Sequence, residues 1–294
     1  MSNELSSSPI PGVLAGWEGM SQAERDAAYN NTASVKDVAI LHAARAAASA
    51  TMRARPGALL DIAYGTGLRN CVDMFPASDS GAPCLVFIHG GYWQMNSKES
   101  FACLGEGVAA HGWSVALPGY TLAPDATLSE IVAEIATALS FLAERGPGFG
   151  IAGPLIVAGW SAGGHLAALA LEHPHVVAGL SISGLHELAP LRDTYLNERL
   201  RLSSHEIEQL SPLRRPAVAK PLVIAYGTAE LTALICSSRA FFDYREAACV
   251  PGALIPVDNR NHFTILPELQ SPDGVLTSAL LRLRGWCFSP DYDL

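Results

Sequence analysis

Residues 159–163 form the pentapeptide Gly-Trp-Ser-Ala-Gly, which stands between two segments of different character. The apolar run 155–158 before it is typical of a buried strand, and residues 165–171 after it favour a helix. A serine in such a place lies on a sharp, strained strand-to-helix turn, where the flanking glycines leave room for the neighbouring backbone. The pentapeptide therefore predicts a nucleophile at Ser161, although a Gly/Ser-rich turn without catalytic function fits the five residues equally well.

A second motif, His-Gly-Gly-Tyr-Trp at residues 89–93, favours the catalytic interpretation of the serine turn. It follows the apolar run 84–88, so its two glycines leave the backbone bare at the end of another buried strand. Acyl transfer needs N–H donors aimed at the oxygen that becomes negative, and here they come from this loop and from the residue after the nucleophile. We expect these donors to be Gly91, Tyr92 and Ala162. Each motif follows a predicted buried strand, and the serine turn also precedes a predicted helix, as these motifs require. The two motifs together therefore predict a serine hydrolase.

A serine nucleophile needs a base, and the expected order along the chain is serine, then an acid, then histidine. We predict His262 as the base, because it follows the last apolar run and a polar turn that can return it toward Ser161. Residues 221–230 read as a strand that ends in a carboxylate, which predicts Glu230 as the acid. Asp258 is the rival acid, and a solvated loop carboxylate is the other interpretation of Glu230.

The matching residues extend well beyond this expected triad. With the His-Gly-Gly and Asn-His-Phe motifs, the chain resembles the arylformamidase (kynurenine formamidase) branch of the α/β-hydrolases. The segments that carry the resemblance are 89–94, 120–124, 183–185, 188–212, 238–241 and 261–263. The resemblance implies an α/β-hydrolase fold with Ser161 as nucleophile, Glu230 as acid and His262 as base. Two positions depart from the family pattern: the acid is Glu rather than Asp, and Trp160 replaces a small or imidazole residue.

The resemblance implies that this protein removes a small, formyl-like acyl group from an aromatic amide. N-formylkynurenine or another N-formyl or short-acyl aromatic is the expected substrate, and neither a metal nor an organic cofactor is expected. A short-chain carboxylesterase is the alternative, because residues 120–124 and His-Gly-Gly are shared with hormone-sensitive-lipase-like esterases. A noncatalytic ligand-binding protein of the same fold is the third interpretation, although such proteins usually lack a triad member.

The substrate pocket is expected to have an aromatic wall near the nucleophile. Each side chain taken singly is more often part of a core than of a ligand wall. By the resemblance, Asn197 is expected to face the polar end of the substrate. The other expected wall residues, besides Tyr92, are Trp93, Trp160, His186 and Tyr195.

Alternating strand and helix patterns predict one mostly parallel, eight-stranded sheet with helices on both faces. We expect the strands at 59–64, 71–75, 84–88, 114–117, 155–158, 177–182, 222–225 and 254–257. We expect helices between them at 99–110, 128–144, 162–172, 232–247 and 274–284. The first two strands are expected to pair antiparallel at one edge.

Two regions stand outside this alternation. Residues 1–55 are expected to form an N-terminal helical segment, and residues 56–294 the catalytic domain with a lid insertion at about 189–219. Both regions are expected to cover the site, because insertions at the carboxyl ends of parallel strands shape the pocket there. The alanine-rich stretch 34–54 also fits an ordinary amphipathic packing helix.

Bulk properties fit a compact enzyme that acts on a small molecule. The 294 residues carry a net charge of −9 without a block of like charges, so we expect neither a nucleic-acid nor a membrane partner. The N-terminus lacks a signal-peptide pattern, and the six cysteines lack metal-ligand spacing, so we expect reduced, buried thiols in a cytoplasmic protein. An apolar composition of 49% is compatible with a homodimer.

Overall fold

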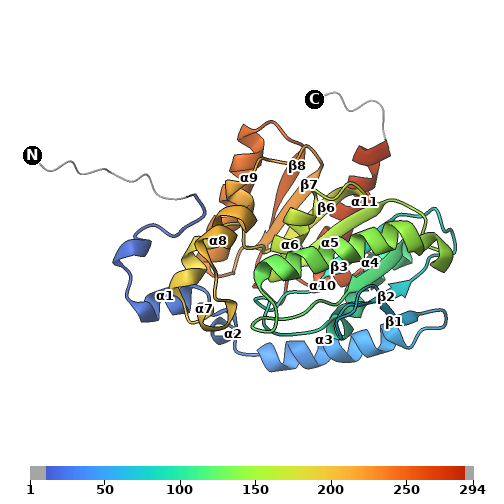
Figure 1. Ribbon diagram of the computed structural model, residues 1–294, viewed down its shortest axis with the longest axis horizontal. Coiled ribbons are helices and arrows are strands. Elements are labelled where there is room, and N and C mark those ends of the chain that lie inside the picture. The colour runs from blue at the N-terminus through green and yellow to red at the C-terminus, as the bar shows by residue number, and fades with distance from the viewer. Residues whose placement is uncertain (1–10, 289–294) are drawn as a thin grey trace, which may run out of the picture.

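Eight strands form one sheet in the order β1-β2-β4-β3-β5-β6-β7-β8 in the computed structural model, which describes residues 11–288 (Figure 1). Strands β3 to β8 run parallel where they pair, while β1 and β2 make the antiparallel edge. The strands are β1 (Leu59–Ala63), β2 (Cys71–Phe75), β3 (Cys84–Ile88), β4 (Ser114–Pro118), β5 (Leu155–Trp160), β6 (Val176–Ile182), β7 (Leu222–Gly227) and β8 (Gly252–Val257). The predicted sheet and its antiparallel edge are confirmed.

Helices cover both faces of this sheet, which explains why the central strands read as unbroken apolar runs. Strands β3, β4, β5 and β7 are buried at every residue. One face packs against α5 (Leu128–Arg145), α6 (Ala162–Ala170) and α9 (Thr232–Ala247). The other packs against α3 (Val38–Arg53), η2 (Lys98–Gly105), α4 (Glu106–Ala110), α10 (Pro267–Gln270) and α11 (Val275–Phe288).

The expected helix over 99–110 is divided in the structure into the 3₁₀ helix η2 and the α-helix α4. Gly105 stands at the junction, where a Cβ would overlap the side chain of Val115 on β4. Because glycine is a weak helix former and the packing here is close, the winding changes at this residue. The helix expected over 34–54 is also shorter, since α3 begins at Val38.

Short helices gather at one end of the molecule, at the left in Figure 1. They come from two separate parts of the chain, the N-terminal segment and the insertion after β6. The N-terminal ones are η1 (Trp17–Gly19), α1 (Gln22–Ala28) and α2 (Asn31–Ser34), and those of the insertion are η4 (Ala189–Asp193), α7 (Asn197–Leu200), α8 (Ser204–Leu210) and η5 (Pro212–Arg214). A further 3₁₀ turn, η3 (Gly146–Phe149), follows α5.

The cysteines do not all follow the prediction of buried thiols. Cys84 and Cys103 are buried, but Cys249 is exposed because it lies in the turn that leads from α9 to β8. The side chain of Cys287 lies outside the described part of the structure. Within residues 11–288, no helix has the length and apolarity needed to cross a bilayer.

Three buried histidines should make the fold sensitive to mild acid. Burial lowers the pKa of His89 and of His165 to about 4, and the pKa of His186 to about 3. Each is neutral in the folded chain, whereas an unfolded histidine takes up a proton near pH 6.5. The free energy of unfolding is therefore highest above pH 6.5. As the pH falls below this value, each histidine lowers the free energy of unfolding by about 1.4 kcal/mol per pH unit.

Urea unfolding between pH 6.5 and 5 tests this expectation. The free energy of unfolding should fall by up to about 4 kcal/mol per pH unit if all three histidines contribute. The matched variant His165→Leu should lose about one third of that slope. A slope that is flat in the wild type, or unchanged in the variant, would contradict the assignment.

Candidate active site

The turn at Ser161 has the strained backbone expected for the nucleophile position. Its φ is 57° and its ψ is −119°, and its N–H donates to the carbonyl of Ile182 at 2.8 Å. A Cβ on Gly159 would overlap the carbonyl of Gly163, and a Cβ on Gly163 would overlap that of Ile88. Glycine is thus required on both sides of the serine, because β5 and α6 meet here without space for side chains.

The carboxylate of Glu230 holds the imidazole of His262. Oε2 of Glu230 lies 3.0 Å from Nδ1 of His262, and both side chains are buried. The other oxygen, Oε1, accepts hydrogen bonds from Ser183 Oγ at 2.6 Å and from the N–H of Gly227 at 2.7 Å. Since a carboxylate only accepts, it fixes the imidazole proton on Nδ1 and leaves the lone pair of Nε2 available for a proton.

The rival acid, Asp258, has a different environment. It is exposed in the turn after β8, whereas His262 pairs with Glu230 at the carboxyl ends of the strands. Geometry therefore favours Glu230 over Asp258 as the partner of the imidazole.

The loop after β3 lies directly against the serine turn. A Cβ on Gly90 would meet the Trp160 carbonyl and the side chain of Ser161. The next three residues all have a positive φ: 121° at Gly91, 49° at Tyr92 and 57° at Trp93. In residues other than glycine this conformation costs of order 1–3 kcal/mol, so surrounding contacts must hold it.

These dihedrals leave backbone donors unused beside the nucleophile. Within residues 11–288, the N–H groups of Gly91, Tyr92 and Ala162 donate no hydrogen bond. Ala162 is the first residue of α6, where an N–H has no partner inside the helix. Free N–H groups on a loop that contacts the serine turn, and at the first residue of α6, are the kind of donor that an oxyanion needs.

Distant parts of the chain hold the loop in this shape. Asn96 Nδ2 donates to the Gly90 carbonyl at 3.0 Å, and the Tyr120 hydroxyl donates to the carbonyl of His89 at 2.8 Å. The hydroxyl of Tyr92 reaches the N-terminal segment and bonds to Tyr29 and Asn31. Sequence reasoning missed Tyr29 and Asn31, because a contact over some sixty residues leaves no local pattern.

Ser183 is the other residue that sequence reasoning left without a role. The resemblance included residues 183–185, yet only the folded geometry shows the serine hydroxyl on the Glu230 carboxylate. Its φ of 52° is also in the left-handed region, so the end of β6 is shaped to aim this hydroxyl.

The two tryptophans expected in the pocket wall are both buried. Trp160 is 3% exposed, its indole N–H donates to the His262 carbonyl at 2.8 Å, and its ring lies 4.7 Å from the imidazole centroid. Trp160 therefore packs against the imidazole of His262. Trp93 is fully buried, with its ring edge-on to His165 at 5.0 Å.

The three remaining pocket residues have different environments. His186 is fully buried, stacked on Phe241 at 4.3 Å and hydrogen-bonded with Ser181, so it is a core histidine. Asn197 uses its amide oxygen to accept from the N–H of Leu202, which stabilises the insertion itself. Tyr195 is 40% exposed on the same insertion. The expected aromatic wall therefore stays a prediction, because burial alone does not tell a ligand wall from a core.

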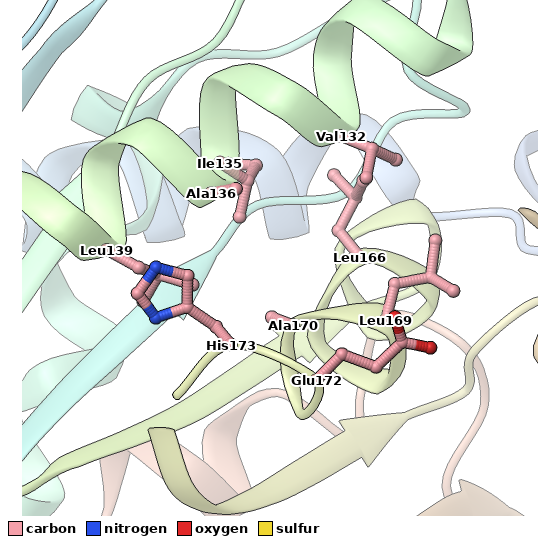
Figure 2. Close-up of a pocket in the computed structure, with 9 residues that line it drawn as sticks. All are labelled: Val132, Ile135, Ala136, Leu139, Leu166, Leu169, Ala170, Glu172 and His173. Carbon is pink, nitrogen blue, oxygen red and sulfur yellow. The ribbon is translucent and has the colours of Figure 1, made fainter. Parts of the chain in front are cut away.

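A cavity of about 240 Å³ lies elsewhere, between α5 and α6 (Figure 2). Its lining is apolar except for Glu172 and His173 beyond the end of α6. The cavity therefore adjoins the helix that carries the serine turn, but none of the expected catalytic residues lines it. Across residues 11–288, no group of three or more His, Cys, Asp or Glu side chains converges as metal ligands would.

Curated relatives align with most of the chain. A kynurenine formamidase from Danio rerio is 26% identical over 92% of this chain and 99% of its own length. A kynurenine formamidase from Drosophila melanogaster is 30% identical over 72% of this chain and 76% of its own length. An isoprenylcysteine alpha-carbonyl methylesterase from Arabidopsis thaliana is 26% identical over 72% of this chain and 57% of its own length.

Solved structures and a family model agree with this similarity. A protein from Silicibacter sp. TM1040, provisionally described as a thioesterase, superposes with a TM-score of 0.80 and 30% identity over 88% of this chain and 99% of its own. Esterase B from Lactobacillus rhamnosis gives a TM-score of 0.69 at 18% identity, over 90% of this chain and 94% of its own, which shows a common fold. The BD-FAE family model matches residues 73–175, which include both glycine-rich motifs.

Proposed function

Because the chain belongs to the kynurenine formamidase family of α/β-hydrolases, we propose that it removes a formyl-like acyl group from an aromatic amide, with N-formylkynurenine as the lead substrate. The observation that carries the proposal is the Glu230–His262 pair beside the strained turn at Ser161. This combination supplies a nucleophile, an acid and a base, in the chain order expected for this fold.

The proposed reaction begins when Ser161 Oγ attacks the formyl carbon and its proton passes to Nε2 of His262. The negative oxygen is held by the N–H groups of Gly91, Tyr92 and Ala162. Glu230 stabilises the imidazolium, which then protonates the leaving nitrogen as the carbon–nitrogen bond breaks. Water, activated by the same imidazole, attacks the formyl-serine ester and releases formate, which restores the free serine.

The burial of the nucleophile and of the base supports a small acyl group. Ser161 is 2% exposed and His262 is 3% exposed, so the covered site favours a compact acyl group over a long chain. An aromatic amine is also a better leaving group than an alkyl amine, which favours an aryl amide as substrate.

The cover is formed by the N-terminal segment together with the insertion, which we treat as one two-part lid. Gln22 Nε2 donates to the Asp193 carbonyl at 2.9 Å, and the N–H of Tyr195 donates to Asp26 at 2.8 Å. Gln94 Nε2, just after the His-Gly-Gly motif, donates to the Leu196 carbonyl at 2.9 Å. The lid assignment concerns residues 11–55 and 189–219, while residues 1–10 lie outside the described part.

A short-chain carboxylesterase is the second candidate function. It is favoured by the methylesterase relative and by the fold shared with esterase B. Both reactions use the same triad and oxyanion donors, so the difference lies in the leaving group that the covered site accepts.

Steady-state kinetics on N-formyl-L-kynurenine, p-nitrophenyl acetate and p-nitrophenyl butyrate separate the two functions. We expect kcat/KM for the formamide to equal or exceed the values for both esters, and acetate to be preferred over butyrate. Ester hydrolysis without formamide hydrolysis would reject the formamidase assignment and leave the esterase.

A further inference from the structure

We propose that Asn31 and the carbonyl of Tyr29 are positioning groups for the oxyanion hole, acting through the hydroxyl of Tyr92. The inference rests on the proposed function, because it assumes that the Tyr92 N–H faces the developing negative charge. It assigns to the N-terminal segment a part in catalysis beyond covering the site.

The backbone conformation of Tyr92 needs contacts from other residues to hold it. Its φ of 49° falls between two other positive values, and only the first of these three residues is a glycine. A bulky residue in the left-handed region returns to an extended conformation unless neighbouring groups hold it. Such a return would turn the Tyr92 N–H away from the nucleophile, since the N–H direction follows the backbone dihedrals.

The side chain of Tyr92 is held by the N-terminal segment. The Tyr92 hydroxyl donates to the Tyr29 carbonyl at 2.6 Å and accepts from Asn31 Nδ2 at 2.9 Å. The N–H of Asn31 also donates to the Tyr29 carbonyl at 3.1 Å, which joins the two groups into one unit. All three residues are buried, so water does not compete for these bonds.

The phenol of Tyr92 is suited to donate a hydrogen bond to the Tyr29 carbonyl. Burial, with smaller contributions from Tyr195, Tyr29 and Glu230, raises the pKa of Tyr92 well above its ordinary value. The hydroxyl therefore keeps its proton at working pH and remains a donor to the Tyr29 carbonyl.

The side chain of Asn31 has a feature that a merely structural residue would lack. Its Oδ1 is buried and has no hydrogen-bond partner among residues 11–288, so the side chain brings an unsatisfied acceptor into the core. A residue selected for packing alone would avoid such an acceptor. What asparagine offers at this position, and a leucine of similar shape does not, is the N–H donor to Tyr92.

The test compares Asn31→Leu, Tyr92→Phe and the double variant with the wild type, using both N-formyl-L-kynurenine and p-nitrophenyl acetate. Asn30→Ala is the matched control, because Asn30 Oδ1 caps the same short helix through the N–H of Ala33 and has no bond to Tyr92. Thermal unfolding of each variant is measured alongside kcat and KM.

We expect Asn31→Leu and Tyr92→Phe each to lower kcat by about 10- to 100-fold, with KM changed by less than about threefold, as for a displaced oxyanion donor. The double variant should be no slower than the slower single variant, since both break one unit. Asn31→Leu should keep its melting temperature while losing rate. Asn30→Ala should keep kcat within about twofold of the wild type.

Three results would overturn the proposal: unchanged kcat in Asn31→Leu, losses that multiply in the double variant, or an equal loss in Asn30→Ala. If Asn31→Leu does not fold, Tyr92→Phe decides by the same split between kcat and KM. A wild type that hydrolyses the ester alone would reject the formamidase function and still test the positioning groups. A wild type that hydrolyses neither substrate would overturn both.

Discussion

Ser161→Ala is expected to lower kcat/KM by about 10⁵- to 10⁶-fold on every substrate that the wild type hydrolyses. The reason is that the remaining donors and the imidazole have no nucleophile to act with, so only direct attack by water is left. The fold should be retained, because alanine removes one hydroxyl from a position whose backbone is fixed by close contacts with Gly90 and Ile182.

Labelling by a fluorophosphonate probe gives an independent measurement of the same variant. The wild type should be labelled at one site, and Ser161→Ala should not be labelled. Ser238→Ala is the matched control, because Ser238 is also a buried serine, and its hydroxyl has no hydrogen-bond partner in the described part of the chain. Labelling that persists in Ser161→Ala, or disappears in Ser238→Ala, would place the nucleophile elsewhere.

The sheet and the serine turn were predictable because their signals are local. A buried strand requires an apolar run, and the close approach of β5 and α6 requires glycine at 159 and at 163. The Glu230 position followed from topology, since carboxyl ends of parallel strands meet at one edge of a sheet. Boundaries were less certain: β5 continues to Trp160 and β7 to Gly227, beyond the predicted ends, because strand pairing extends to those residues.

The groups that support the site were not predictable from the sequence. Asn31 meets Tyr92, and Ser183 meets Glu230, through contacts that only the folded chain creates. The pocket residues stay a prediction for the opposite reason: aromatic character is a local signal, but it does not tell a ligand wall from a core. Trp160 fills the space behind His262, and His186 fills the space beside Phe241.

These supporting contacts change how the covered site should be understood. The N-terminal segment bonds both to the insertion, through Gln22 and Asp26, and to the oxyanion loop, through Tyr92. Under the proposed function, opening the lid on this side would therefore also release the loop that carries Gly91 and Tyr92. Under the proposed function, the oxyanion donors are therefore held in place only while the N-terminal segment covers the site.

Glu230→Gln is expected to lower kcat by about 10⁴-fold, an effect of the size found when a triad acid becomes an amide. Oε1 of Glu230 faces the N–H of Gly227, which can only donate, so the amide oxygen of glutamine must take this place. The amide nitrogen then takes the place of Oε2 and directs its protons at Nδ1 of His262. The imidazole is forced to carry its proton on Nε2, where it cannot accept the proton of Ser161.

The control for this variant is Asp258→Asn, which changes the exposed rival carboxylate in the same way and should keep kcat within about twofold, as exposed charges usually do. Equal losses in the two variants, or a loss confined to Asp258→Asn, would reassign the acid to the turn after β8.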